Sequence, residues 1–341
     1  MSSVAGGVAV GIDLGGTKIA AGLVGDDGTV TERITVPTTA SLGPASVVTD
    51  LIKIISNLQD RARRQGVEVK GIGVASAGAV DPERGVLVAV TDALPGFESF
   101  PLRRELERLA LANIAVLNDV HAMALGEQHF GVGRRAKDVL YVAVGTGVGG
   151  AMTRSGALVL GAHGFAGDIG HVLIDSSPSA RRCPCGRNGH LEAYVSGPAL
   201  ASEYHRQGGK VGLEGDLRPV AERAGYGDTQ AKDILREGGQ LLGRTIGGIV
   251  NLLNPELVVF GGGLLDLTDG LFWDHVADRL RKEVRVSVAP RVERAQLGGD
   301  AAIVGAAVAG RANLGAFLYG PTQGDQQGFP SLANSRPASI T

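Results

Sequence analysis

The chain has 341 residues, of which 44% are hydrophobic and 20% charged, so it is long enough for two globular domains. Its 33 basic and 35 acidic residues leave a net charge of −2. The chain therefore lacks the excess of positive charge that is typical of proteins that bind nucleic acid or an anionic membrane. Residues 1–7 contain no basic residue, and no apolar run is long enough to span a bilayer, so we expect a cytoplasmic protein with a small-molecule partner.

The first third of the chain reads as alternating strands and helices. Short apolar runs bounded by turn residues predict strands at 8–13, 19–24, 30–36, 71–75 and 114–117. Hydrophobic residues at helical spacing predict helices at 44–65 and 101–111. The first two strands are joined by a glycine turn at residues 15–18. This alternation favours an α/β domain.

The rest of the chain repeats this plan of strands that meet glycine turns. The predicted elements are a helix near 120–129, strands at 138–144 and 257–260, a long helix at 228–254, and helices at 273–284 and 301–313. Glycine turns follow the two strands at 145–150 and 261–263. From about residue 320 the chain is rich in Pro, Gly, Gln and Ser, which predicts a disordered tail at 320–341.

The three glycine turns form the first candidate site. Glycine lets successive backbone N–H groups point together at an anion, and a Thr hydroxyl or Lys ammonium can add to that cradle. Singly, such a turn is more often a plain tight turn, and none of the three is a Walker loop. Three in one chain, with Asp13 placed to hold a hydrated magnesium ion, favour nucleotide phosphates. The residues concerned are Asp13, Gly15, Gly16, Thr17, Lys18, Gly145, Thr146, Gly147, Gly262 and Gly263.

A second candidate site is the pair Asn118 and Asp119, where one predicted domain passes to the next. The carboxylate of Asp119 can accept the proton of a sugar hydroxyl as it attacks phosphorus, while the amide of Asn118 orients neighbouring hydroxyls. Both residue types are also favoured as helix N-caps. The residues alone leave both roles open.

Four side chains predict a zinc site: His171, Cys183, Cys185 and His190. The two cysteines, the only ones in the chain, are separated by one residue, which is awkward for a disulfide and natural for two ligands of one metal. Two thiolates and two imidazoles are the four ligands of a closed tetrahedral zinc site. Because no position is left for water, the zinc would be structural.

These motifs resemble the ROK family, which comprises bacterial repressors, open reading frames and sugar kinases. The resemblance extends from about residue 8 to residue 315 and rests on the runs 13–18, 77–81, 118–119 and 145–150 and on the Gly-His and Cys-x-Cys-Gly block. It implies an α/β, actin-like ATPase and sugar-kinase fold, with two domains around a cleft. They would be residues 1–118, completed by a C-terminal helix at 301–315, and residues 119–300, which carry the zinc motif.

The resemblance also implies an activity, the ATP-dependent phosphorylation of the 6-hydroxyl of glucose or a glucose-like aminohexose such as kanosamine or glucosamine. Asp119 would be the general base, the first two glycine turns would bind phosphates, and the third would lie near the adenosine. His171 would bind zinc through one ring nitrogen and sugar through the other. The sugar would contact Gly78, Asn118, Asp119, Asp168, His171 and Glu192. ATP, Mg²⁺ and structural Zn²⁺ are the implied cofactors, and a homodimer or homotetramer is the implied assembly.

The chain departs from the family pattern at three positions. Asp168 stands where a glutamate is usual, His190 where a third cysteine is usual, and Ala93 near a usual asparagine. The shorter acid withdraws its carboxylate by about 1.5 Å, one C–C bond. Either the backbone shifts, a water bridges the gap, or the substrate carries an amino group there.

Two other functions fit the same resemblance. One is a ROK-type sugar-responsive transcriptional regulator, which we do not expect, since such proteins carry a helix-turn-helix ahead of the first phosphate loop and Asp13 lies near the start of this chain. The other is a sugar-binding protein without catalysis, which would follow if Asp119 were only a helix cap.

Overall fold

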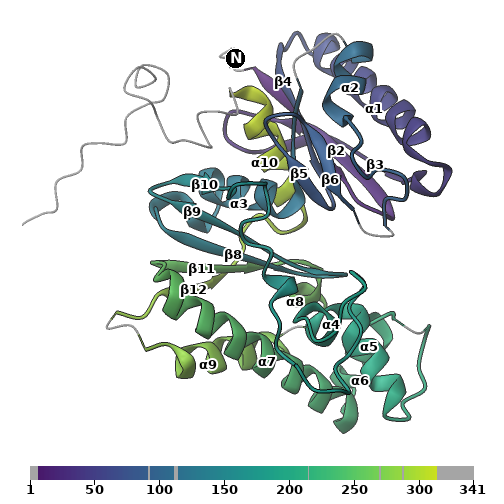
Figure 1. Cartoon of the computed structure of the whole chain (residues 1–341). Helices are drawn as coiled ribbons and strands as arrows, with labels where there is room; N and C mark the ends of the chain where they lie inside the picture. The colour runs from purple at the N-terminus through teal and green to yellow at the C-terminus, as the bar shows by residue number, and fades with distance from the viewer. Residues whose placement is uncertain are drawn as a thin grey trace, which may run out of the picture.

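Two mixed five-stranded sheets form the centres of two lobes, which lie one above the other in Figure 1. The computed structural model describes residues 7–90, 93–110, 114–213, 215–268, 270–285 and 288–312. The predicted tail at 320–341 and residues 313–315 of the predicted last helix lie outside the described residues. Because helices cover both sheets, the predicted α/β class is confirmed.

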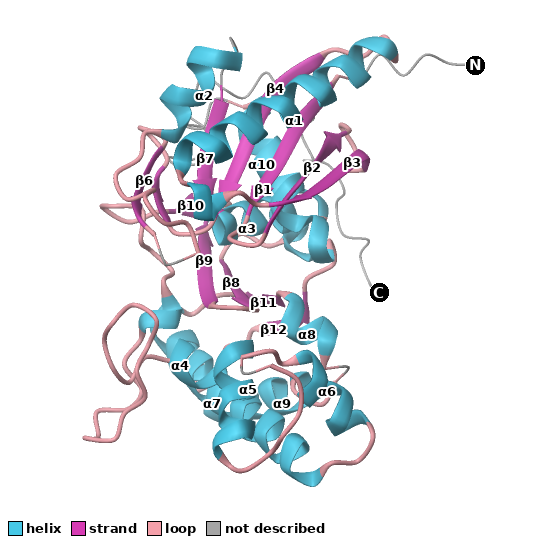
Figure 2. Cartoon of the chain, turned by 90° about the vertical axis from the view of Figure 1, so that its right-hand side faces the viewer, coloured by secondary structure: helices cyan, strands magenta, loops and turns pink. Residues whose placement is uncertain are grey.

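The sheet of the first lobe joins an antiparallel meander to two parallel strands. In spatial order its strands are β3 (Val30–Pro37), β2 (Lys18–Val24), β1 (Val8–Leu14), β4 (Val69–Ser76) and β7 (Ile114–Asn118). β4 runs parallel to both β1 and β7. Figure 2 shows α1 (Pro44–Arg64) and α2 (Leu102–Ala110) on one side of this sheet and α10 (Ala301–Arg311) on the other.

Glycines in the central strands let α10 pack directly on the sheet. A Cβ atom at Gly11 would lie 2.0 Å from the carbonyl oxygen of Ile303, and one at Gly73 would lie 1.7 Å from that of Ala306. Any side chain at these positions would push the helix away. The last described helix therefore returns to the first lobe, although its sequence follows the second.

The sheet of the second lobe repeats the same plan. Its strands, in spatial order, are β10 (Ala157–Val159), β9 (Val148–Arg154), β8 (Val139–Val144), β11 (Leu257–Gly261) and β12 (Arg291–Arg294). The sequence predicted only β8 and β11 of these, and β9 begins inside the predicted glycine turn at 145–150. β8, β9 and β10 are antiparallel, whereas β8, β11 and β12 are parallel. Each lobe thus has a glycine turn between its first two strands.

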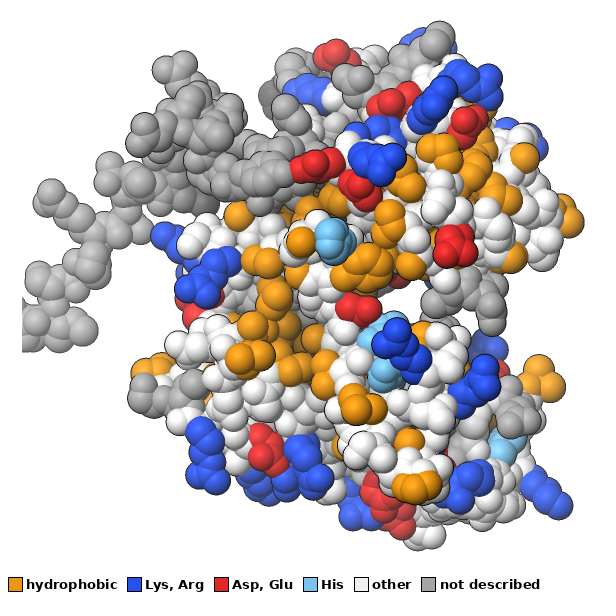
Figure 3. Space-filling view, viewed as in Figure 1, with side chains coloured by type: hydrophobic (Ala, Val, Ile, Leu, Met, Phe, Trp, Pro, Cys, Tyr) orange, Lys and Arg blue, Asp and Glu red, His pale blue; other side chains and the backbone are white. Residues whose placement is uncertain are grey.

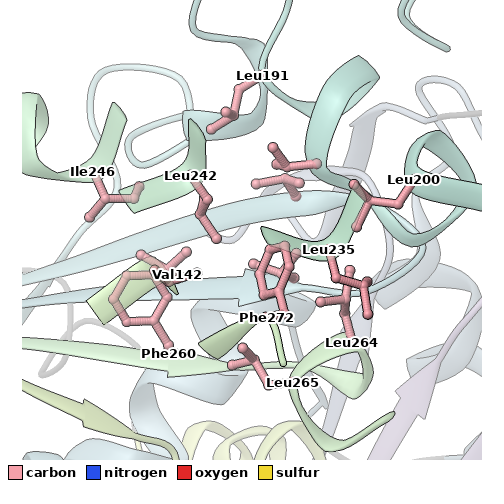
Figure 4. Close-up of a cluster of buried hydrophobic side chains, with 14 of the residues drawn as sticks. Val142, Leu191, Leu200, Leu235, Leu242, Ile246, Phe260, Leu264, Leu265 and Phe272 are labelled. Carbon is pink, nitrogen blue, oxygen red and sulfur yellow. The ribbon is translucent and has the colours of Figure 1, made fainter. Parts of the chain in front are cut away.

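Helices fill the lower part of the second lobe (Figure 1). They are α4 (Glu192–Val195), α5 (Gly197–Arg206), α6 (Arg218–Gly225), α7 (Thr229–Leu253), α8 (Gly263–Leu267) and α9 (Trp273–Glu283). α7 begins where the side chain of Asp228 accepts a hydrogen bond from Ala231 N and ends at the left-handed Asn254, close to the predicted 228–254. Its apolar face packs against the sheet, and Figure 4 shows Leu242 directed toward Val142 and Phe260.

Helix α3 (Asp119–Phe130) lies between the two lobes. It packs against α10 and β4 on one side and against β8 and β9 on the other. The shared apolar layer contains Leu117 from the first sheet and Tyr141 and Val259 from the second. On this arrangement we propose residues 1–118 with α10, and residues 119–300, as the two domains.

The remaining elements are short. A two-stranded hairpin of β5 (Ala79–Asp81) and β6 (Val86–Ala89), which the sequence reading did not predict, follows β4. The described residues also include the 3₁₀ turns η1 (Ala40–Leu42), η2 (Val132–Arg135), η3 (Ile169–His171) and η4 (Gly298–Asp300). Within the described ranges, no helix has both the length and the apolarity that crossing a membrane requires.

Candidate active site

Parallel pairing brings polar residues together at one edge of the first sheet. Leu14 is paired with Ser76, and Ser76 with Asn118, so the carboxyl ends of β1, β4 and β7 are level. Asp13 and the pair Asn118 and Asp119 therefore meet at this edge, where open α/β sheets bind their ligands. Figure 3 shows the molecule hollowed between the two lobes, with acidic and histidine side chains beside the hollow.

Asn118 caps helix α3 and also holds Asp119. Its Oδ1 accepts hydrogen bonds from the backbone N–H groups of Val120, at 2.9 Å, and His121, at 3.1 Å. Its Nδ2 donates to Asp119 Oδ1, at 2.8 Å, and to the carbonyl oxygen of Gly78, at 2.9 Å. The cap predicted as one reading of this pair thus belongs to Asn118, and it leaves Asp119 free for another role.

Asp119 has the environment of a general base. Its Oδ1 accepts from Val120 N at 2.9 Å, and no hydrogen bond from the described residues reaches Oδ2. Burial, reinforced by the negative charge of Asp13, raises the pKa of Asp119 to about 7. Burial also raises the pKa of Asp13, against the opposing charge of Lys18. A carboxylate whose pKa lies near neutral pH is well suited to accept a proton there.

The second and third glycine turns lie side by side in the second lobe. β8 and β11 are parallel neighbours that pair Ala143 with Gly261, so the turns that follow them adjoin. Gly262 has φ of +100°, and a Cβ there would lie 2.4 Å from the carbonyl oxygen of Val144. Only glycine fits this close approach.

The first glycine turn belongs to the other lobe, between β1 and β2. The backbone N–H of Gly15 donates to the carbonyl oxygen of Lys18 at 3.0 Å, which closes the turn. A Cβ at Gly16 would lie 2.5 Å from the Cβ of Ala93. Ala93, one of the positions where the chain departs from the family pattern, thus lies against this turn.

Glu192 lies between the second glycine turn and the segment that carries Cys183 and Cys185. Its Oε2 accepts a hydrogen bond from Val148 N at 2.8 Å and lies against Gly147, where a Cβ would come within 2.7 Å of it. Its Oε1 lies 4.0 Å from the Sγ atom of Cys183. Glu192 therefore braces the turn, and the sugar contact expected of it stays a prediction.

The four predicted zinc ligands come together. One ligand atom from each of His171, Cys183, Cys185 and His190 lies within 4.8 Å of all the others, and Cys185 Sγ lies 3.2 Å from His190 Nδ1. Burial raises the pKa of the Cys183 thiol to about 11, so deprotonation there needs a compensating positive charge. Two sulfur and two nitrogen donors suit Zn²⁺ rather than an oxygen-seeking cation such as Mg²⁺.

Asp168 forms a hydrogen bond with one of these ligands. The distance between Asp168 Oδ1 and His171 Nδ1 is 2.7 Å. This hydrogen bond raises the pKa of His171 to about 9. The segment before Asp168 is held to helix α3, because His121 Nε2 lies 3.2 Å from the carbonyl oxygen of Ala166.

A group of polar contacts, which was not predicted from the sequence, holds the residues that precede the two cysteines. The guanidinium of Arg181 lies 4.6 Å from the ring centroid of Tyr194 and binds Glu203 at 2.7 Å. The hydroxyl of Tyr194 donates to Asp175 Oδ2 at 2.5 Å and accepts from Arg181 N at 2.9 Å. These residues follow no period or motif, so no signal in the sequence identifies them.

Known proteins share this fold and these motifs. The ROK family model matches residues 9–312. A glucokinase of Thermotoga maritima is 30% identical over 314 residues, which are 86% of this chain and 96% of that protein. An N-acetylmannosamine kinase of Escherichia coli is 37% identical over 254 residues, 74% of this chain and 82% of that protein. The crystal structure of a ROK family glucokinase from Streptomyces griseus, in complex with glucose and AMPPNP, has a TM-score of 0.78 and 29% identity, and the match covers 89% of this chain and 99% of that one. This structural relative and the family match confirm the predicted actin-like fold.

Proposed function

The chain belongs to the ROK family, and on that basis we propose that it is an ATP-dependent kinase that phosphorylates the 6-hydroxyl of a hexose. The observation that carries this proposal is the environment of Asp119, a partly buried carboxylate with a pKa of about 7 at the junction of the two lobes. A residue that served only as a helix cap would need neither the raised pKa nor a neighbour that caps the helix in its place.

In the proposed reaction Asp119 accepts the proton of the sugar hydroxyl as the oxygen bonds to the γ-phosphorus. The bond from that phosphorus to the bridging oxygen of ATP breaks, and ADP leaves with the electron pair. Asn118 keeps the carboxylate of Asp119 in place through the 2.8 Å hydrogen bond from its Nδ2. Backbone N–H groups of the glycine turns would donate to the phosphates. Asp13 would hold hydrated Mg²⁺, which neutralises phosphate charge when bound.

The family relatives support a hexose as the class of substrate, since their names specify glucose and N-acetylmannosamine. We propose glucose or a glucose-like aminohexose, such as kanosamine or glucosamine. The carboxylate of Asp168 is 42% exposed, and only its Oδ1 is engaged by His171. Its other oxygen can meet an ammonium group in a charge-assisted hydrogen bond or reach a hydroxyl through water.

The four-ligand cluster fits a structural zinc ion. His171, Cys183, Cys185 and His190 would hold it, and it would fix the segment 171–190 in the folded state. All four positions are supplied by protein, so zinc would have no direct part in phosphoryl transfer.

A kinase assay over glucose, mannose, N-acetylated hexosamines and free aminohexoses tests the proposal. We expect turnover of at least one sugar with ATP, and Asp119→Asn should lower its kcat by at least about 10²-fold while the affinity for sugar stays similar. An Asn variant that keeps more than half of the activity would refute the role of Asp119. No turnover of any sugar by the parent would favour a regulator or a non-catalytic sugar-binding protein.

A further inference from the structure

A cavity of about 730 Å³ lies between the two lobes, outside the candidate active site. One wall is the hairpin of β5 and β6, and the other is β10 with the loop that follows it, residues 160–165. Figures 1 and 2 both show this hairpin beside β10. Among the described residues that line the cavity, none is assigned above to sugar, nucleotide or zinc. The volume is within the range of about 300 to 1,000 Å³ that is usual for small-molecule sites.

The two lobes touch at the wall of this cavity. Gly164, which lines it, has φ of +80°, and a Cβ there would lie 2.5 Å from the carbonyl oxygen of Val80 in β5. Only glycine fits this close approach of the loop to the hairpin. A ligand in the cavity therefore contacts both lobes beside a point where they meet.

The wall offers an aromatic ring and polar groups of both hydrogen-bonding kinds. The side chain of Phe165 is 44% exposed although it is large and apolar. Asp81 Oδ1 accepts from Arg84 N at 3.0 Å, and no hydrogen bond from the described residues reaches Oδ2. Arg154 and His163 also line the cavity. A guanidinium only donates hydrogen bonds, whereas a neutral imidazole donates through one nitrogen and accepts through the other.

The chemistry of the wall favours a neutral ligand with many hydroxyl groups. Asp81 and Glu83 are acidic and Arg154 is basic, so the wall carries charges of both signs. β10 is the outer strand of the described sheet, so its free edge presents backbone groups without a strand partner. An extended peptide can add a strand to such an edge, but β10 has only three residues. Hydroxyl groups both donate and accept, so they match this mixed lining.

We propose that the cavity is a second saccharide site, which binds a neutral sugar and stabilises the described arrangement of the lobes. The ring of Phe165 would lie against a face of the sugar, Asp81 would accept from its hydroxyls, and Arg154 would donate to them. Because the ligand touches both walls, it binds more tightly to the arrangement in which they face each other than to one in which they are apart. This inference goes beyond the proposed kinase activity and does not depend on it.

Isothermal titration calorimetry with glucose, maltose, cellobiose and sucrose, without ATP, tests the site. The parent is compared with Phe165→Ala, which removes the ring, and with Ala162→Trp, which places a large side chain at an exposed loop residue that lines the cavity. We expect at least one of these sugars to bind to the parent and to bind at least about fivefold more weakly to both variants. Tyr226→Ala removes an aromatic ring that is 86% exposed outside the cavity, so it is the matched control and should leave binding unchanged.

Hydrogen exchange measured by mass spectrometry locates the bound sugar. In the parent, the sugar should slow exchange in both walls, residues 79–89 and 157–165, and this protection should disappear in Ala162→Trp. Both substituted side chains are exposed, so we expect the variants to fold, and circular dichroism checks this.

Absence of binding by all four sugars would overturn the inference. So would binding of the same affinity in both folded variants, or protection confined to the candidate active site. If the chain phosphorylates a hexose but binds only one sugar molecule, at Asp119, the kinase proposal stands and the second site is refuted. If a sugar binds in the cavity but no sugar is phosphorylated, the kinase proposal fails and the second site stands.

Discussion

Replacement of Asp119 by Asn should make the protein more stable at neutral and alkaline pH while it removes the general base. The structure raises the pKa of this carboxyl from 3.8 to about 7, chiefly by burial. A rise of about three pKa units corresponds to roughly 4 kcal/mol of unfavourable free energy in the ionised folded state. The amide of Asn cannot ionise, and its oxygen can still accept the hydrogen bonds from Val120 and Asn118. The substitution should therefore raise the free energy of unfolding by up to about 4 kcal/mol at neutral and alkaline pH.

The sign of this effect depends on pH. Below about pH 4 the carboxyl is protonated in both states and contributes no difference. Between about pH 4 and 7 the unfolded chain ionises first, so the folded parent binds a proton that the unfolded chain has lost, and the free energy of unfolding falls as pH rises. The advantage of the Asn variant should therefore grow from pH 5 to pH 7 and stay constant above it.

Urea unfolding at pH 5, 6, 7 and 8, followed by the fluorescence of Trp273, the single tryptophan, measures this difference. Both proteins are kept at the same zinc concentration without nucleotide, so that other titrating groups contribute equally. Asp278 is the control, because its hydrogen bond from Lys282 lowers its pKa, and Asp278→Asn should bring no gain that grows with pH. An Asp119→Asn variant whose advantage stays the same from pH 5 to pH 8 would refute the raised pKa.

Three further outcomes follow from the structure. Glu127 is fully buried and accepts hydrogen bonds from the backbone N–H groups of Val132, at 3.1 Å, and Leu297, at 2.7 Å. Glu127→Ala leaves both donors without a partner, so it should lower the free energy of unfolding by about 2 to 4 kcal/mol. A loss of less than about 1 kcal/mol in urea unfolding would contradict this. Gly73→Ala would place a Cβ 1.7 Å from the carbonyl oxygen of Ala306, so it should lower the free energy of unfolding by at least about 1 to 3 kcal/mol. A melting temperature equal to that of the parent would show that α10 does not pack as closely on the sheet as described. If Asp168 recognises an amino group, Asp168→Glu should change the ratio of kcat/KM for glucosamine or kanosamine to kcat/KM for glucose. If the parent prefers glucose at least tenfold and the variant has the same ratio, Asp168 does not set the specificity and the enzyme is a glucokinase.

Much of the fold could be predicted because its boundaries depend on local chemistry. Helix α7 begins at a capping Asp228 and ends just before Pro255, and both signals are visible in the sequence. All five strands of the first sheet were predicted, whereas in the second sheet only β8 and β11 were predicted, and β9, β10 and β12 were not. The hairpin of β5 and β6 was not predicted, since strands of three and four residues are too short for a period-two pattern to appear.

The candidate site was predictable by residue type and spacing but not by contact. The zinc cluster follows from two thiols and two imidazoles, which come from a short part of the chain. The hydrogen bond between Asp168 and His171 depends on a single 3₁₀ turn, and the burial of Glu127 depends on the approach of residue 297 from far along the chain. No local pattern fixes such distant or rotamer-dependent contacts.

The central claim, that Asp119 activates a sugar hydroxyl for attack on ATP, is tested most directly by ³¹P NMR of the reaction products. The purified chain is incubated with ATP, Mg²⁺ and each hexose of the panel. We predict ADP and a hexose 6-phosphate in equal amounts with the parent, and at least about 10²-fold slower formation with Asp119→Asn. Formation of the 6-phosphate at an undiminished rate by the Asn variant, or ADP without any sugar phosphate from the parent, would contradict the account.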